Sequence, residues 1–133
     1  MKDLAIYYRC AQFYSHAAHN LASGDEFFQD HEYLGELYGA YETAYDDVIE
    51  RMIGLGKSPD PMAITLSGAE TAKGYGIPKD DKEWFTKLVE IEGEICDIIK
   101  VLVPKATDGT QNLLQGLADE SEKRQFLIGQ RIK

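Results

Sequence analysis

Three histidines lie close together near the start of the chain, at positions 16, 19 and 31. His19 and His31 each stand six residues from Asp25, at the centre of the turn expected between two helices. Positions equidistant from such a turn lie side by side in an antiparallel helical hairpin, so these two imidazoles can meet. Converging imidazoles are typical of a metal site, but they also occur as solvated or hydrogen-bonded histidines at helix ends. The spacing leaves both interpretations open.

Asp46 and Glu50 are four residues apart on the expected second helix, so both carboxylates project from one face. Such a pair either binds a cation or is an ordinary exposed acidic surface. His31 and Asp46 are 15 residues apart, which is roughly 22 Å along one helix axis. One ion therefore cannot contact both within one chain. If two such helices pair antiparallel across a two-fold axis, however, the histidine end of one meets the carboxylate end of the other.

The ligand types indicate which metal such a shared site would take. Imidazole and carboxylate ligands suit Fe(II) with open coordination positions, whereas thiolates favour zinc or copper(I). No histidine has a glutamate three residues before it, which argues against a di-iron centre inside a single bundle. Cys10 and Cys96 lie in apolar helical patterns away from the histidines, and we expect them to be reduced core thiols.

Four segments have the apolar spacing of amphipathic helices, and none alternates convincingly as a strand. The first covers residues 4–21. Ser23 and Glu26 then have the spacing of a capping box, which predicts the start of the next helix. The second apolar pattern covers residues 34–55, where Gly56 can end the helix.

Residues 57–78 contain three of the four prolines, which predicts a long crossover with one short helix near 63–72. A third long helix is expected over 84–102, ended by Pro104, and a fourth from 108–110 onward. Two helical hairpins joined by a long crossover describe an all-α, ferritin-like four-helix bundle.

The composition bounds the remaining possibilities. A length of 133 residues, with 44% hydrophobic and 28% charged residues, predicts one globular domain over 1–133. No apolar run approaches the ~20 residues of a membrane span, and the N-terminus has no secretory signal, so we expect a cytoplasmic protein. The net charge of −9 attracts cations and repels phosphate backbones. DNA is therefore disfavoured as a partner, although a basic cluster occurs at Lys123, Arg124, Arg131 and Lys133.

The sequence resembles the Dps mini-ferritins, the DNA-binding proteins of starved cells. The resemblance rests on His19, Phe27-Phe28, His31, Asp46-x3-Glu50-Arg51, Leu55-Gly56, the turn residue Gly24, the crossover length and Asp108-Gly-Thr110. It implies a cytoplasmic homododecameric shell that acts as a ferroxidase, oxidises Fe(II) with hydrogen peroxide or oxygen, stores the ferric mineral and protects against oxidative stress. It further implies that His19 and His31 of one subunit and Asp46 and Glu50 of the next bind the iron.

Gly35 is the first departure from the family pattern. Family members usually have an aspartate there, four residues after the second histidine, so one carboxylate ligand is missing. Glu32 and Glu36 point ~100° away on either side, so either could replace it only through a local distortion. The resemblance implies that Gly35→Asp strengthens metal binding.

Asn20 is the second departure, because the family commonly has a tryptophan there that takes up oxidising equivalents. Any such role would pass to other aromatic residues, of which the second helix offers Tyr33, Tyr38, Tyr41 and Tyr45. Their spacing equally fits core and interface packing. His16 lies one helical step from His19 and is an extra ligand, a partner of a ligand or a structural residue.

Three hypotheses follow. The first is an iron-oxidising storage shell. The second is a Dps-like structural shell whose iron site is degenerate, and the third is an unrelated acidic helical bundle that binds a protein partner. A shell-sized particle separates the first two from the third, and iron-dependent absorbance separates the first from the second. Because the helical pattern begins at Leu4, no Lys-rich arm is expected, and we predict that the protein does not bind DNA.

Overall fold

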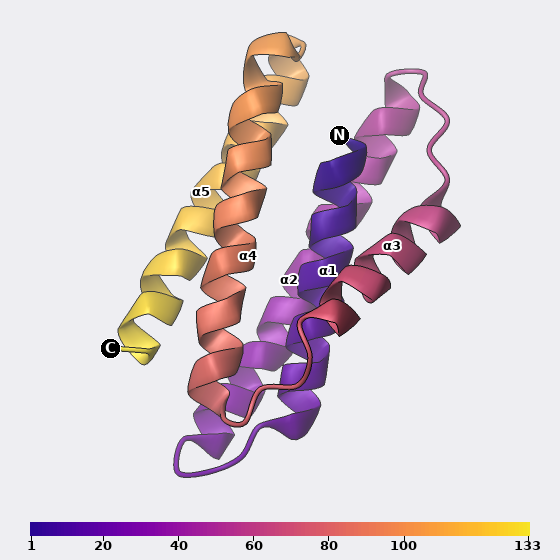
Figure 1. Cartoon of the computed structure of the whole chain (residues 1–133). Coiled ribbons are helices and arrows are strands. Elements are labelled where there is room, and N and C mark those ends of the chain that lie inside the picture. Colours follow the sequence, from indigo (N-terminus) through magenta and orange to yellow (C-terminus); the bar gives the residue numbers. More distant parts are fainter.

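Two antiparallel helical hairpins, joined by a long connection, make up the computed structural model, which describes all 133 residues (Figure 1). The helices are α1 (Lys2–Leu21), α2 (Phe27–Gly54), α3 (Pro61–Gly74), α4 (Asp81–Leu102), the short 3₁₀ helix η1 (Val103–Lys105) and α5 (Asp108–Arg131). α1 pairs with α2, α4 pairs with α5, and α3 lies in the crossover. The predicted all-α, ferritin-like fold is confirmed.

The core lies between the two hairpins, and α1 contacts α2, α3 and α4. Its buried side chains recur at intervals of three and four along each long helix, as an amphipathic stripe requires. On α4 they are Trp84, Phe85, Leu88, Ile91, Ile95 and Ile99. The predicted pattern on α5 holds only in part: Leu114 and Ile128 are buried, whereas Phe126 and Leu127 are exposed.

Helix ends follow local chemistry at most positions. Gly56 has a φ of +82°, the left-handed conformation that ends a helix, and it directly follows the cap residue of α2. Pro61 opens α3, where the carboxylate of Asp60 accepts hydrogen bonds from the backbone N–H groups of Met62 and Ala63. These ends confirm the sequence interpretation of the α2 terminus and of the crossover helix.

The predicted capping box at the α1–α2 turn is wrong. α2 begins at Phe27, and no side chain caps its first turn. The backbone N–H of Ser23 instead donates to both carboxylate oxygens of Asp81, at 3.1 and 3.3 Å. Asp81 is buried at the first turn of α4 and needs donors, so a residue 58 positions away determines how the turn is held.

Arg131 extends this attachment to the last turn of α5. Its guanidinium donates two hydrogen bonds, of 2.9 and 2.8 Å, to the buried carboxylate of Asp30. We call Ser23, Asp30, Asp81 and Arg131 the turn anchor. Because Asp30 directly precedes His31, the turn anchor fixes the hairpin that carries the histidines to both α4 and α5.

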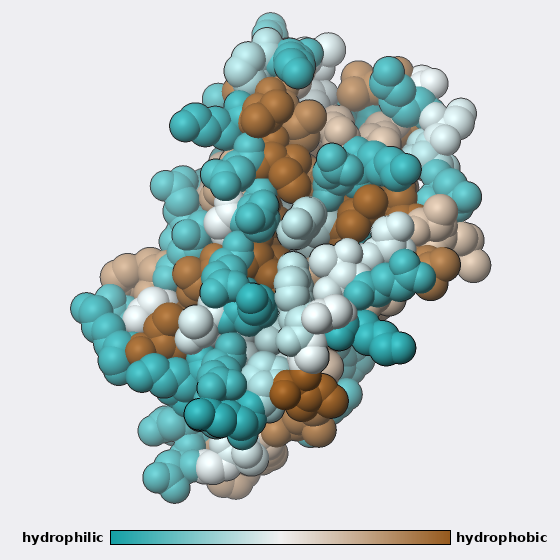
Figure 2. All heavy atoms as spheres, in the orientation of Figure 1, coloured by the Kyte–Doolittle hydropathy of each residue, from teal (hydrophilic) through white to brown (hydrophobic).

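On the face shown in Figure 2, polar side chains predominate, and apolar side chains show between them. The most exposed of the large ones are Phe28, Met62 and Ile77. No helix combines the length and the apolar character that a membrane crossing requires.

Candidate metal centre

His19, in the last turn of α1, and His31, in the second turn of α2, stack on each other across the hairpin. Their ring centroids are 3.8 Å apart and the ring planes are inclined by 18°. The predicted meeting of the two imidazoles is therefore confirmed, whereas their function as ligands stays a prediction. We refer to His19 and His31 as the hairpin pair.

Each imidazole of the hairpin pair forms a hydrogen bond to the backbone of the other residue. His19 Nδ1 lies 2.6 Å from the carbonyl oxygen of His31, and His31 Nδ1 lies 2.9 Å from that of His19. A carbonyl oxygen only accepts, so both Nδ1 atoms carry the proton and donate it. Both Nε2 atoms then retain a lone pair in the neutral imidazole, which is the form that binds a metal.

The same hydrogen bonds also serve the backbone. The carbonyl of His19 is among the last four of α1, which have no partner within their own helix, and His31 supplies one. The arrangement is thus compatible with both interpretations that the sequence left open, a metal site and hydrogen-bonded histidines at helix ends. The Nδ1 atoms satisfy helix carbonyls, while the Nε2 atoms are free to bind something else.

Further aromatic rings surround the hairpin pair. Phe27 stacks on His31 with a centroid distance of 5.1 Å, and Tyr38 approaches His19 edge-on at 5.4 Å. His16 is exposed and stacks on Tyr38 at 4.0 Å with the planes only 6° apart. Among the four candidate tyrosines, Tyr38 is therefore the one that contacts the histidines; Tyr41 and Tyr45 are buried in the core and Tyr33 is half-buried.

The acidic residues of the predicted site do not join the hairpin pair within one chain. Asp46 and Glu50 are both exposed in the second half of α2, and Glu32 and Glu36 are exposed nearer the histidines. No three His, Cys, Asp or Glu side chains of the chain come together closely enough to hold a metal ion. A single chain thus presents two imidazoles and, separately, two carboxylates.

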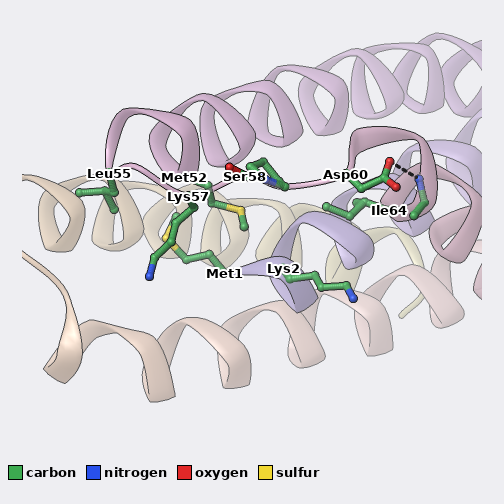
Figure 3. Close-up of a pocket in the computed structure, with 10 residues that line it drawn as sticks. Met1, Lys2, Met52, Leu55, Lys57, Ser58, Asp60 and Ile64 are labelled. Carbon is green, nitrogen blue, oxygen red and sulfur yellow. Dashed lines mark hydrogen bonds between the residues drawn. The ribbon is translucent and has the colours of Figure 1, made fainter.

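A groove of about 510 Å³ lies at the other end of the α1–α2 hairpin (Figure 3). It is lined by the start of α1, the end of α2 and the connection to α3, including Met52, Leu55 and Ile64. The charged side chains on its rim, Lys2, Lys57 and Asp60, are not a ligand set for a divalent cation.

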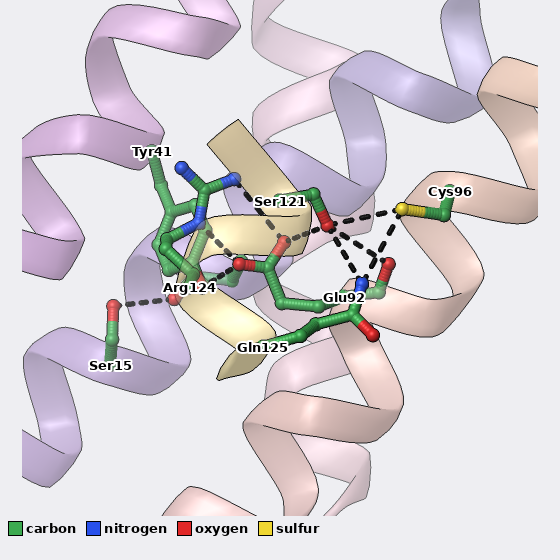
Figure 4. Close-up of polar contacts among 8 residues, drawn as sticks. Ser15, Tyr41, Glu92, Cys96, Ser121, Arg124 and Gln125 are labelled. Atoms are coloured by element: carbon green, nitrogen blue, oxygen red, sulfur yellow. Dashed lines mark hydrogen bonds and ion pairs between the residues drawn. The ribbon is translucent and has the colours of Figure 1, made fainter. Parts of the chain in front are cut away.

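The centre of the bundle holds a polar cluster that the sequence analysis missed (Figure 4). Glu92 is fully buried and accepts hydrogen bonds from Tyr41 at 3.0 Å, from Ser121 at 3.1 Å and from both Nε and an NH2 group of Arg124. Burial raises the pKa of Tyr41 well above its ordinary value, so its hydroxyl stays protonated and donates. We call Tyr41, Glu92, Ser121 and Arg124 the central cluster.

The central cluster corrects the interpretation of the C-terminal basic residues as one cluster. Arg124 is largely buried and neutralises Glu92, and Arg131 is bound to Asp30 in the turn anchor. The sequence contained one signal from which the central cluster could have been predicted. It was an acid, Glu92, within the apolar stripe of α4, between Leu88 and Ile95. An acid in such a stripe requires a buried partner.

Comparisons with known proteins agree with this architecture. The model of the ferritin-like domain matches residues 2–132. DNA protection during starvation protein 2 from Deinococcus radiodurans is 32% identical over 113 residues, which are 82% of this chain and 47% of that protein. The chain thus spans about half the length of this relative. A match over nearly every residue of an all-helical bundle establishes that the chain belongs to the ferritin-like family, within which it is a Dps-type mini-ferritin.

Proposed function

We propose that this chain is the subunit of a mini-ferritin that oxidises Fe(II) and stores the ferric product inside a shell of identical subunits. His19 and His31 of one subunit, with Asp46 and Glu50 of its two-fold neighbour, would bind Fe(II) as the substrate. Hydrogen peroxide or oxygen would be the oxidant.

The observation that carries this proposal is the reciprocal pair of contacts between the Nδ1 atoms and the backbone carbonyls of His19 and His31. Both imidazoles donate from Nδ1 to backbone carbonyls, which leaves two Nε2 lone pairs on rings that are 3.8 Å apart. Backbone hydrogen bonds of this kind hold a metal-binding histidine in its ligating orientation before the ion arrives.

Charge supports a partner subunit as the source of the carboxylates. Two neutral imidazoles do not balance the +2 charge of one Fe(II) ion, whereas two carboxylates, with a combined charge of −2, do. Asp46 and Glu50 are exposed one helical turn apart on α2, so they remain available to a neighbouring copy. The overall charge of −9 also raises the local concentration of cations.

The reaction follows from these ligands. Two Fe(II) ions each give up one electron, and hydrogen peroxide accepts both as its O–O bond breaks. With water, the products are ferric oxyhydroxide and four protons for each two ions oxidised. Imidazole and carboxylate ligands leave open positions on Fe(II) for the oxidant.

The proposed assembly is a homododecamer, built from a single domain over residues 1–133 and located in the cytoplasm. Its function would be iron storage and protection against oxidative stress. DNA is not a proposed partner of this chain, even though the name of its relative refers to DNA protection. Light scattering tests the assembly, with an expected mass near twelve times 14.9 kDa.

The decisive experiment is Fe(II) oxidation by His31→Ala, Glu50→Ala and a mixture of the two. Each variant alone should oxidise Fe(II) far more slowly than the wild type. Glu122→Ala, which removes an exposed acid from α5, is the matched control and should oxidise at the wild-type rate.

The mixture tests whether the site is shared. Subunits that are dissociated, mixed and reassembled pair at random, so about a quarter of the sites combine an intact histidine half with an intact acidic half. Activity should therefore recover in the mixture. A site within one chain would show no recovery, and wild-type rates in both single variants would refute the proposed ligands. An inactive wild type that still forms the shell would identify a degenerate site.

A further inference from the structure

Gly35 lies on α2 one helical turn beyond His31, against the ring of His19. A Cβ atom added to Gly35 would lie 3.2 Å from both Cε1 and Nδ1 of His19. Carbon contacts are most favourable at about 3.5–4.0 Å, so any side chain at position 35 would press on the ring. The ring occupies the space that a side chain would need.

His19 has little freedom to move away. Its Nδ1, one of the two atoms that the added Cβ would meet, already donates to the His31 carbonyl at 2.6 Å. One face of its ring is stacked on His31 at 3.8 Å, and Tyr38 contacts it edge-on at 5.4 Å. A shift of a few tenths of an ångström would lengthen or tilt the Nδ1 hydrogen bond and disturb the stack.

Gly39, one turn further along the same helix, provides the contrast. A Cβ at Gly39 would meet nothing within 4 Å. Both glycines have the same cost in backbone entropy, since both lie inside α2. Only at position 35 is there a steric reason for glycine, because a side chain there would meet the imidazole of His19.

We infer that Gly35 is a positioning residue for His19. The missing side chain lets the imidazole lie against the backbone of α2, where Nδ1 reaches the His31 carbonyl and Nε2 remains free. Glycine at position 35 is then required for the arrangement of the hairpin pair, and does not merely leave the site without a carboxylate. This inference predicts the reverse of the sequence-based expectation that Gly35→Asp strengthens metal binding, because the Cβ atom of the aspartate would press on the imidazole of His19. The metal-binding part of this inference rests on the proposed function, whereas the placement of the ring does not.

Crystal structures of the metal-free protein and anaerobic titrations with Co²⁺ test the inference on Gly35→Ala and Gly39→Ala. In Gly35→Ala, the His19 ring should be displaced and its Nδ1 contact with the His31 carbonyl lost. The affinity for Co²⁺ should fall about 10- to 100-fold, as it does when a ligand loses its orienting partner. Gly39→Ala should match the wild type in both measurements.

A double-mutant cycle in thermal unfolding keeps the test decisive if Gly35→Ala is poorly folded. Gly35→Ala should lower the melting temperature in the wild-type background. In a His19→Ala background it should raise the melting temperature, as we expect Gly39→Ala to do in either background. A cost that persists without the imidazole would overturn the inference. So would a His19 ring that keeps its wild-type position in Gly35→Ala, or tighter Co²⁺ binding by Gly35→Asp. A wild type that binds no Co²⁺ would count against the proposed function, and the crystal structures and the cycle would still decide the role of Gly35.

Discussion

The central cluster and the hairpin pair are both polar groups held between helices, but they differ in what they leave unused. In the central cluster, both oxygens of Glu92 accept hydrogen bonds, and the cation that balances its charge is the guanidinium of Arg124. In the hairpin pair, each imidazole uses only Nδ1. The central cluster therefore has no unused ligand atom on Glu92, whereas the hairpin pair has an unused Nε2 atom on each ring. Changes to the central cluster should therefore alter stability, and changes to the hairpin pair should alter metal binding.

The largest expected effect is the loss of Arg124. Arg124→Ala leaves the carboxylate of Glu92 buried without a counter-charge, which typically costs about 3–5 kcal/mol. Denaturant unfolding at a fixed protein concentration should show this loss in the free energy of unfolding.

The double variant Glu92→Gln with Arg124→Met sharpens the same measurement. It removes both charges, so it should recover most of the stability that Arg124→Ala loses. Under conditions in which Arg124→Ala is still folded, its affinity for Co²⁺ should equal that of the wild type. A change of less than about 1 kcal/mol in Arg124→Ala would mean that the central cluster is open to water or to another cation.

The turn anchor gives a smaller effect that depends on pH. Burial, together with a hydrogen bond to Asp30, raises the pKa of Asp81 to about 6 from an ordinary value of 3.8. The folded state therefore holds this proton more tightly than the unfolded state does. The stability contributed by protonated Asp81 is present at low pH and is lost as the pH rises through about 6.

Asp81→Asn keeps an oxygen that accepts from Ser23 and removes this titration. As the pH rises from 4 to 7, the free energy of unfolding of Asp81→Asn should increase relative to that of the wild type. The increase should be at most about 3 kcal/mol for a pKa shift of this size. Unfolding curves at several pH values measure the difference. If the difference in free energy of unfolding between the two proteins does not change with pH, Asp81 is ionised throughout the range from pH 4 to pH 7.

Predictability from sequence follows the range of the interactions. Apolar spacing predicted the long helices, because it is a property of each single helix. Equal distances from Asp25 predicted that His19 and His31 meet, because this is a property of one hairpin. The capping box at Ser23 failed because its backbone N–H binds Asp81 in another hairpin. Glu92 and Arg124 went unrecognised as a pair because they lie 32 residues apart on different helices. Gly35 could be recognised as a missing acid, but the ring that needs its space is visible only in three dimensions.

The smallest expected effect is on DNA, where we predict none. The basic residues near the C-terminus would suggest a phosphate-binding patch. Both arginines of this patch, however, are bound to carboxylates in the central cluster and the turn anchor. Arg124 is bound to Glu92 and Arg131 to Asp30, while Lys123 pairs with Asp119 and Glu120 on the surface of α5. Of the four basic side chains, only Lys133 then has no carboxylate partner. With a net charge of −9 on every chain, the proposed shell should repel the DNA backbone. In a mobility-shift experiment at ~150 mM salt, duplex DNA should migrate as free DNA, since contacts driven by phosphate charge weaken steeply with salt. A shift that Lys123→Ala abolishes would show that this region presents free positive charge after all, and that α5 is less closed than its ion pairs indicate.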